Sequence, residues 1–282
     1  MQRQVRTLVD GLGFPEAPRW HDGHLWCSDM AAHEILELDL EGARVRTTPT
    51  PFEPSGLGWL PDGTLLVVAM DERAVMARRG DGFAVHADLG HLLTSRANDM
   101  VVAEDGTAYV TSFGYDAATE EPRPAHLVKV DPDGRVEVVP GDLWRPNGVA
   151  VTADGATLLV AETRVHRVTA FRRAPDGRLS DPRVVGELPS GTWADGICLD
   201  ADGGIWVGDP KGRACYRIVP GTGVTERIDT APGACVACVL GGPARTTLFL
   251  AIGALGDMAD RARERAGRID AVEVDVPGAG RP

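Results

Sequence analysis

An internal repeat is the feature of this chain that most restricts its fold. A short apolar strand, an Asp-Gly turn and a second apolar strand recur six times, as in GLGWLPDGTLLVVAM from Gly56 and DMVVAEDGTAYVTSF from Asp99. Asp-Gly favours hairpin turns because glycine adopts positive φ without strain. The turn residues are Asp22, Asp62, Asp105, Asp154, Asp202 and, in a degenerate copy, Gly242.

A second turn separates consecutive copies, so each period of about 40–50 residues predicts two hairpins, or four strands. Four antiparallel strands per period are typical of a propeller blade, and six blades close a ring around a central channel. We therefore predict an all-β fold, a single six-bladed β-propeller domain spanning residues 1–282. A β-sandwich or two β domains are the alternatives, but neither predicts six regular copies.

The two ends of the chain are both strand-like. The N-terminal VRTLV and the C-terminal RIDAVEVDV are predicted to pair in one blade and so close the ring. Helical periodicity is nearly absent. The one plausible helix, Asp257–Ala266, is charged and rich in arginine, and we interpret it as a surface loop insertion.

Composition excludes several classes of partner. Asp and Glu number 41 against 29 Lys and Arg, and a net charge of −12 disfavours nucleic acid. Apolar runs are too short to span a bilayer, so no membrane partner is expected. The five cysteines, in a chain without a secretory signal pattern, predict reduced thiols and a cytoplasmic protein. We expect a monomer or a weak homo-oligomer.

Polar residues recur at one position of the repeat. Seven residues before the turn residue stand Ser55, Asn98, Asn147 and Asp195, and Glu16 lies six residues before Asp22. Equivalent positions in a closed ring lie at the same end of the channel, so these side chains are predicted to converge there. Carboxylate and amide oxygens suit Ca²⁺, Mg²⁺ or Mn²⁺ better than Zn²⁺ or Cu²⁺. The alternative is that they only stabilise turns.

The return strand of each copy brings further side chains back to this end. Asp29, Glu162 and Asp209 either hold the ligand residues in place or are solvated loop residues. Tyr115 and Trp193 flank the polar positions and are candidates for the wall of a pocket.

Four motifs, FPEAPRW, RANDM, RPNGVAV and WADGICLD, together with GRIDAVEVDVPG, resemble the SMP-30/gluconolactonase/LRE-like family of regucalcin and bacterial sugar lactonases. The resemblance runs from about Gly11 to Val276 and implies a six-bladed propeller with one divalent metal at a channel mouth. It implies Glu16, Asn147 and Asp195 as metal ligands, Asn98 as an additional ligand or a substrate contact, and Arg96 as a substrate contact. The expected cation is Ca²⁺, with Mg²⁺, Mn²⁺, Zn²⁺ or Fe²⁺ as alternatives.

The implied reaction is hydrolysis of a lactone, with the metal polarising the ester carbonyl and Asp195 as the candidate general base. Phe113, Tyr115, Met70 and Trp193 indicate a partly apolar pocket, so the substrate is a small-molecule lactone other than a free aldonolactone, or another strained ring or ester. Two alternatives remain. One is different metal-assisted chemistry on the same propeller, such as a cyclase or ring-opening reaction. The other is a non-catalytic binding propeller.

Overall fold

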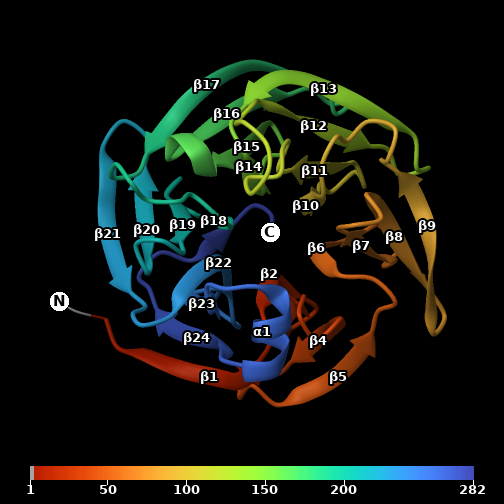
Figure 1. The fold of residues 1–282 in the computed structure, drawn as a ribbon. Helices are drawn as coiled ribbons and strands as arrows, with labels where there is room; N and C mark the ends of the chain where they lie inside the picture. Colours follow the sequence, from red (N-terminus) through yellow and green to blue (C-terminus); the bar gives the residue numbers. More distant parts are fainter. Residues whose placement is uncertain (1–2) are drawn as a thin grey trace.

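The computed structural model describes residues 3–282 and consists almost entirely of β-strands. Six antiparallel sheets stand around a central channel like the blades of a propeller (Figure 1). The innermost strands of the six blades are β2, β6, β10, β14, β18 and β22. The predicted six-bladed, all-β fold is therefore confirmed.

Each of the first four blades uses four strands in chain order. Blade 1 comprises β2 (Pro15–His21), β3 (His24–Asp29), β4 (Glu34–Leu38) and β5 (Arg44–Pro49). Blade 2 comprises β6 (Pro54–Trp59), β7 (Leu65–Ala69), β8 (Ala74–Arg79) and β9 (Gly82–Asp88). Blade 3 comprises β10 (Ala97–Val102), β11 (Ala108–Ser112), β12 (Ala125–Val130) and β13 (Val136–Leu143). Blade 4 comprises β14 (Pro146–Val151), β15 (Thr157–Glu162), β16 (Arg167–Arg173) and β17 (Leu179–Glu187), with the short 3₁₀ helix η1 (Thr163–Val165) after β15.

The last two blades recruit the ends of the chain. Blade 5 comprises β18 (Ile197–Asp200), β19 (Ile205–Asp209), β20 (Ala214–Val219), β21 (Gly223–Asp229) and the short β25 (Gly278–Ala279). Blade 6 comprises β22 (Ala234–Gly241), β23 (Thr247–Gly253), β24 (Gly267–Glu273) and the N-terminal β1 (Val5–Leu12). β25 was not anticipated from the sequence.

The Asp-Gly turns form as the repeat predicts. In the turn between β6 and β7, the Asp62 carboxylate accepts a 2.9 Å hydrogen bond from the Thr64 amide, and Gly63 has φ of 83°. The turn between β10 and β11 repeats this arrangement, with a 2.9 Å bond from the Thr107 amide to Asp105. Aspartate thus satisfies a backbone donor while glycine supplies the positive φ.

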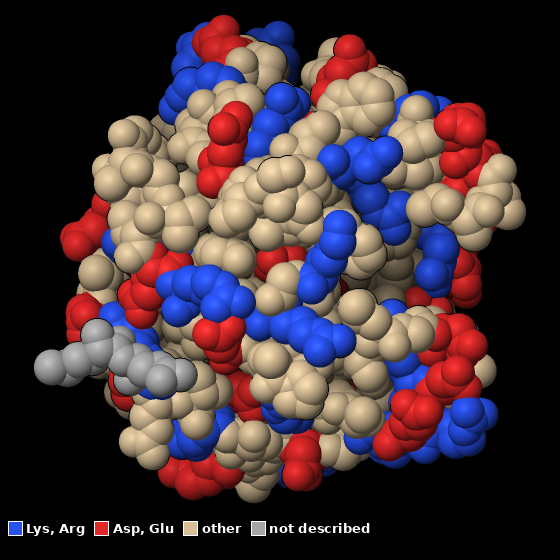
Figure 2. All heavy atoms as spheres, turned by 60° about the vertical axis from the view of Figure 1, so that its left-hand side comes forward, with Lys and Arg blue, Asp and Glu red and all other residues tan. Residues whose placement is uncertain are grey.

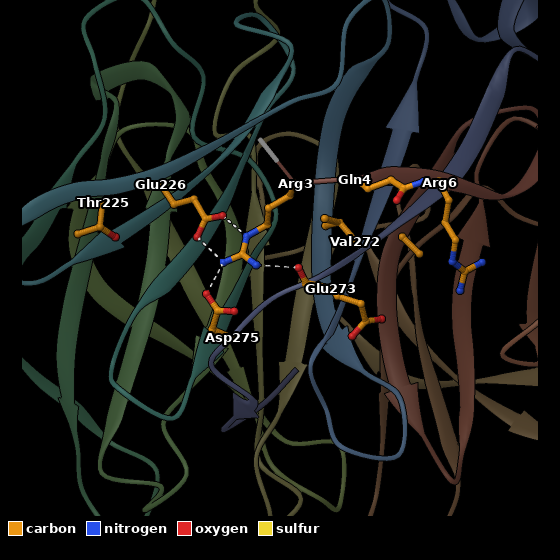
Figure 3. Close-up of a pocket in the computed structure, with 9 residues that line it drawn as sticks. Arg3, Gln4, Arg6, Thr225, Glu226, Val272, Glu273 and Asp275 are labelled. Carbon is orange, nitrogen blue, oxygen red and sulfur yellow. Dashed lines mark hydrogen bonds and ion pairs between the residues drawn. The ribbon is translucent and has the colours of Figure 1, made fainter. Parts of the chain in front are cut away.

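The ring closes through pairing of the two ends, as predicted. β1 runs antiparallel to β24, with Val5 opposite Val272 and Leu12 opposite Gly267. Arg3 then joins blade 6 to blade 5 (Figure 3): it forms an ion pair with Glu226, a 2.8 Å ion pair with Asp275 and a 2.9 Å hydrogen bond to the Glu273 carbonyl. Because these partners lie on different blades, the contacts hold the closing strand to its neighbour.

The C-terminal segment crosses the far end of the channel, near the centre of the ring in Figure 1. Ala279 pairs with Leu199 at the end of β18, and Arg281 bridges to Val151 at the end of β14. Both partners lie at the opposite ends of the inner strands from Asn147 and Asp195. The segment therefore covers the end of the channel away from the predicted polar ring.

Charged side chains of both signs are interspersed on the surface. Figure 2 shows Lys and Arg next to Asp and Glu on the side of the molecule around the N-terminal strand. The net charge of −12 is therefore not gathered into one acidic patch on this side.

The segment after β23 corrects one interpretation. Met258–Glu264 forms the α-helix α1 rather than an irregular loop. The Asp257 carboxylate accepts a 2.8 Å hydrogen bond from the Asp260 amide and so caps the first turn.

Among residues 3–282, no helix has the length and hydropathy that crossing a membrane requires. All five cysteines are free and buried, as expected.

Neighbouring blades approach most closely through glycines on the inner strands. A Cβ on Gly56 would lie 2.4 Å from the Met100 amide nitrogen of blade 3, and one on Gly196 would lie 2.4 Å from the Ala237 Cβ of blade 6. Such distances are too short for any side chain, so glycine lets the inner strands meet at the channel. Each of these glycines directly follows a residue of the predicted polar ring.

Gly56→Ala tests this close packing. Because the added methyl group forces two inner strands apart, we expect a loss of about 1–3 kcal/mol in the free energy of unfolding, measured as a lower Tm. Gly82→Ala is the matched control, since a Cβ there meets no atom within 4 Å. Equal stability of the two variants would contradict the account.

Candidate functional site

The predicted polar ring exists at one end of the channel. Glu16 lies on β2, Asn98 on β10 and Asn147 on β14, while Asp195 lies two residues before the start of β18. Glu16, Asn98 and Asn147 each occupy the second position of an inner strand. Ser55 on β6 and Cys235 on β22 hold the corresponding positions of the remaining two blades, and Cys235 was not recognised as a member of the ring.

A local irregularity recurs near the start of five inner strands. The pairing register shifts after Glu16 in blade 1, after Pro54 in blade 2, after Ala97 in blade 3, after Pro146 in blade 4 and after Cys235 in blade 6. Such bulges bend a strand and redirect its side chains, and they are frequent beside functional sites. The sequence contains the ring residues, but it gives no direct sign of the bulges.

Hydrogen bonds connect the ring residues of blades 3, 4 and 5. The Asn98 side-chain amide donates a 2.7 Å bond to Asn147 Oδ1, and the Asn147 amide reaches Thr163 Oγ1 at 3.4 Å. The Thr163 hydroxyl in turn donates a 2.7 Å bond to the carbonyl of Ala194, the neighbour of Asp195. These bonds fix the two amides relative to the carboxylate-bearing loop.

The two ring carboxylates lie in an environment that disfavours their charge. Burial, then repulsion by Asp99, raises the pKa of Glu16 to about 7, despite a 2.9 Å hydrogen bond from the Ala17 amide. Burial and then repulsion by Glu16 raise the pKa of Asp195 well above its ordinary value. Within residues 3–282 no donor forms a hydrogen bond with the Asp195 carboxylate. Two acidic groups that repel each other here would be stabilised by a cation between them.

The donor set suits an oxygen-binding cation. Glu16 and Asp195 supply carboxylate oxygens, and Asn147 supplies an amide carbonyl with a second lone pair beyond its bond to Asn98. In the part of the chain that the structure describes, no group of three His, Cys, Asp or Glu side chains is placed to hold a metal. A site here therefore depends on the amide oxygen together with the two carboxylates, the donors that hard divalent cations accept.

Asp99, next to Asn98, forms a buried ion pair behind the ring. Its carboxylate lies 2.7 Å from Arg19, which also donates to the carbonyls of Leu57 at 3.0 Å and Met100 at 2.7 Å. This arginine thus joins blades 1, 2 and 3. The Asp99 charge has its own partner, so the pair serves packing.

The residues predicted to contact substrate differ in their surroundings. Arg96 forms ion pairs with Glu53 at 2.7 Å and Asp71 at 2.5 Å. Trp193 is 40% exposed, with the Lys211 ammonium 5.7 Å from its ring centroid. Trp193 therefore presents an aromatic surface to solvent next to the Asp195 loop.

Phe113, Tyr115 and Met70 are less accessible. Phe113 is partly buried and Tyr115 is only 3% exposed. Met70 is fully buried and belongs to the hydrophobic core, so its assignment to an apolar pocket is wrong. Its side chain packs in the core although the next two residues, Asp71 and Glu72, are exposed, and sequence spacing does not reveal this.

Two arginines near the ring were not singled out from the sequence. The Arg145 guanidinium lies 4.4 Å from the Phe113 ring centroid and 5.7 Å from that of Tyr115. Its positive charge lowers the pKa of Asp195, but burial raises that pKa by more. Arg261 on α1 lies 3.9 Å from the Phe14 ring centroid. Among residues 3–282 neither forms an ion pair. Arg145 directly precedes the Pro-Asn of RPNGVAV, which could have identified it.

Two relatives match most of the chain. A 6-deoxy-6-sulfogluconolactonase of Pseudomonas putida is 23% identical over 278 residues, covering 95% of this chain and 93% of that protein. An L-arabinolactonase of Azospirillum brasilense is 27% identical over 238 residues, covering 77% and 76% of the two chains.

Solved structures share the fold. Regucalcin of Agrobacterium tumefaciens, described as a calcium-binding protein, superposes with a TM-score of 0.84 at 22% identity, covering 100% of this chain and 97% of that one. A gluconolactonase of Xanthomonas campestris superposes with a TM-score of 0.75 at 24% identity, covering 98% and 90%.

The family relationship follows from a match along most of the sequence. Residues 14–253, which include all the ring residues, match the model of the SMP-30/Gluconolactonase/LRE-like region. This agrees with the resemblance seen in the motifs. The chain belongs to the SMP-30/gluconolactonase/LRE-like family.

Proposed function

We propose that this protein is a metal-dependent lactonase that hydrolyses a cyclic ester at the polar ring. The observation that carries the proposal is the pair of mutually repelling carboxylates, Glu16 and Asp195, beside the amide of Asn147. The names of the two sugar-lactonase relatives support the reaction class. The calcium-binding description of the structurally similar regucalcin supports the cation.

Glu16, Asn147 and Asp195 would hold the cation, and Asn98 would contact either the cation or the substrate. A bound divalent cation supplies Lewis-acid polarisation of the ester carbonyl. Ca²⁺ is the first candidate because all the donors are oxygens, and Mg²⁺, Mn²⁺, Zn²⁺ and Fe²⁺ are the alternatives.

Asp195 is the proposed general base. Its carboxylate is buried and has no hydrogen-bond donor among residues 3–282, so an oxygen that does not bind the cation is available to accept a proton. It accepts a proton from a water molecule as the water oxygen adds to the lactone carbonyl carbon. The ring C–O bond then breaks, and the released oxygen takes up a proton to give a hydroxy acid.

The remaining side chains would position the lactone. The exposed face of Trp193 and the Phe113 ring under the Arg145 guanidinium combine apolar and cationic surfaces. Arg96 has guanidinium N–H groups beyond those paired with Glu53 and Asp71, and these suit ester or hydroxyl oxygens. We therefore propose a small-molecule lactone with an apolar face. The free, buried thiols suit the proposed cytoplasmic location.

Chelation and an Asp195 variant test the reaction. On a panel of sugar, aliphatic and aromatic lactones, we expect EDTA to abolish hydrolysis and added Ca²⁺ or Mn²⁺ to restore it. Asp195→Asn should lower kcat by about 10²–10⁴, because general-base catalysis supplies acceleration of that order. Asp154→Asn, at an exposed turn at the opposite end of the channel, is the control and should retain wild-type kcat.

Two results would contradict this proposal. Lactone hydrolysis that is unaffected by both EDTA and Asp195→Asn would exclude the metal and the base. A protein that binds the cation but opens none of the lactones would exclude the substrate class and favour another metal-assisted reaction.

The carboxylate pair also predicts how stability depends on pH when the cation is removed. The pKa of Glu16 rises from its ordinary 4.5 to about 7 on folding. Between these values the folded protein binds more protons than the unfolded chain, so the free energy of unfolding decreases as pH rises. We expect Glu16→Gln to lessen the fall in Tm from about pH 5 to about pH 8 in EDTA.

Glu104→Gln, which changes an exposed glutamate, is the matched control and should keep the wild-type pH profile. A Glu16→Gln protein with the same or a steeper pH dependence would show that Glu16 does not bear this destabilising charge.

A further inference from the structure

Three blades of the propeller share a buried carboxylate at the same place. Asp29, Glu162 and Asp209 are the last residues of the second strands of blades 1, 4 and 5, and all three are completely buried. The sequence left open whether they are solvated or hold the ring residues. Their burial excludes the solvated alternative, and a buried carboxylate is costly unless it is hydrogen-bonded.

In blade 5 the carboxylate binds the loop that leads to Asp195. Asp209 Oδ1 accepts a 2.9 Å hydrogen bond from the amide of Trp193, two residues before Asp195, and another of 2.9 Å from the amide of Gly212. The Asp195 amide itself donates a 3.0 Å bond to the Gly208 carbonyl, next to Asp209. The loop before Asp195 is thus fixed to the end of β19.

Blade 1 repeats this arrangement around Glu16. The two oxygens of Asp29 accept 2.8 Å hydrogen bonds from the amides of Gly13 and Phe14, which lie three and two residues before Glu16. The Ala32 amide adds a bond of 3.3 Å at the position that Gly212 takes in blade 5. The same device therefore precedes both ring carboxylates.

Blade 4 uses the longer Glu162 for the loop before Asn147. Its Oε2 accepts a 2.8 Å hydrogen bond from the Trp144 amide, three residues before Asn147. Arg167 at 2.7 Å and the Thr169 hydroxyl at 2.5 Å hold the other oxygen. The carboxylate is therefore fixed on both sides.

Glycines make room for two of these carboxylates. A Cβ on Gly212 would lie 2.1 Å from Asp209 Oδ2, and a Cβ on Gly13 would lie 2.8 Å from Asp29 Oδ1. No larger residue fits at Gly212 without displacing the carboxylate.

The other three blades lack this device. Ala69, Ser112 and Gly253 are the last residues of the second strands of blades 2, 3 and 6, where no carboxylate is present. The buried carboxylates thus occur in the three blades that carry Glu16, Asn147 and Asp195. A purely structural role in blade folding would not require this coincidence.

From this coincidence we infer that Asp29, Glu162 and Asp209 are positioning residues for the cation site: each binds at least one backbone amide of the loop before one proposed ligand and so sets where that ligand stands. This rests on the proposed function for the identity of the ligands. The positioning acts through hydrogen-bond acceptance, so an uncharged acceptor of the same shape should preserve much of it.

Blade 5 offers the sharpest test. Asp209→Ala removes the acceptor, whereas Asp209→Asn keeps an oxygen acceptor but removes the charge. Asp200→Ala is the control, because Asp200 is also buried in the same blade, accepts bonds from the amides of Asp202 and Gly204, and lies at the opposite end of β18, where it pairs with Arg217 at 2.7 Å. All four proteins are compared with their folding verified by circular dichroism.

The first measurement needs no cation. Hydrogen–deuterium exchange of residues 192–196 in EDTA should be about tenfold faster or more in Asp209→Ala than in wild type, because the Trp193 amide loses its acceptor. Asp209→Asn should stay within about threefold, and Asp200→Ala should leave these residues unchanged. The second measurement is calorimetric titration with Ca²⁺ and Mn²⁺, where Kd should rise about 10–100-fold in Asp209→Ala and little in the other two.

Gly212→Ala keeps every charge and remains informative if Asp209→Ala does not fold. Its methyl group displaces the Asp209 carboxylate, so it should speed exchange of the same residues and raise Kd. The inference would be overturned if Asp209→Ala and Gly212→Ala both had the exchange rates and the Kd of the wild-type protein. Equal increases in exchange and Kd in Asp209→Asn and Asp209→Ala would also overturn the inference, because the effect would then come from the lost charge and not from the lost acceptor. The same increases in Asp200→Ala would overturn it as well.

The lactonase proposal fails by a different result. If the variants behave as expected but wild-type protein hydrolyses no lactone, the positioning role stands and the proposed reaction does not. If the wild-type protein hydrolyses lactones but Asp209→Ala and Gly212→Ala leave Kd and exchange unchanged, the proposed reaction stands and the positioning role does not.

Discussion

The close approach of six inner strands around one channel is the constraint on which the rest of this structure depends. A single blade leaves both faces of its sheet uncovered, so the blades are stable only when packed side by side in a closed ring. Glycines such as Gly56 and Gly196 permit backbone contact between neighbours, and β1 paired with β24 completes the ring. Since all inner strands run in the same direction, their first residues meet at one mouth.

That geometry explains why functional residues lie far apart in the sequence. Glu16, Asn147 and Asp195 belong to blades 1, 4 and 5, yet each lies at the start of an inner strand or, for Asp195, two residues before it. Placing two carboxylates there is unfavourable without a counter-charge, as the raised pKa of both groups indicates. The ring thus combines a rigid scaffold with charges that repel each other, a common arrangement at functional sites.

The repeat predicted the architecture because turns and strand patterns are local. Asp-Gly turns, alternating strands and a constant period define the blades without long-range information, and the pairing of the chain ends followed from ring closure. The ring residues were also predictable, because they share one position relative to the turn. Cys235 also stands seven residues before its turn residue, Gly242, so the same spacing could have identified it.

Other features depend on tertiary contacts and could not be predicted. Met70 follows its turn residue by eight residues, as Glu162 does, but its side chain belongs to the hydrophobic core. The C-terminal strand β25 adds to blade 5 through backbone pairing that composition does not encode. The burial of Asp29, Glu162 and Asp209 appears only once the preceding loops fold onto them.

A crystal structure of the protein soaked with Mn²⁺, with anomalous diffraction recorded, tests the central claim most directly. The account predicts one strong anomalous peak at the channel mouth, within coordination distance of oxygens from Glu16, Asn147 and Asp195. The absence of a peak at the polar ring, or a peak that contacts none of these oxygens, would contradict it.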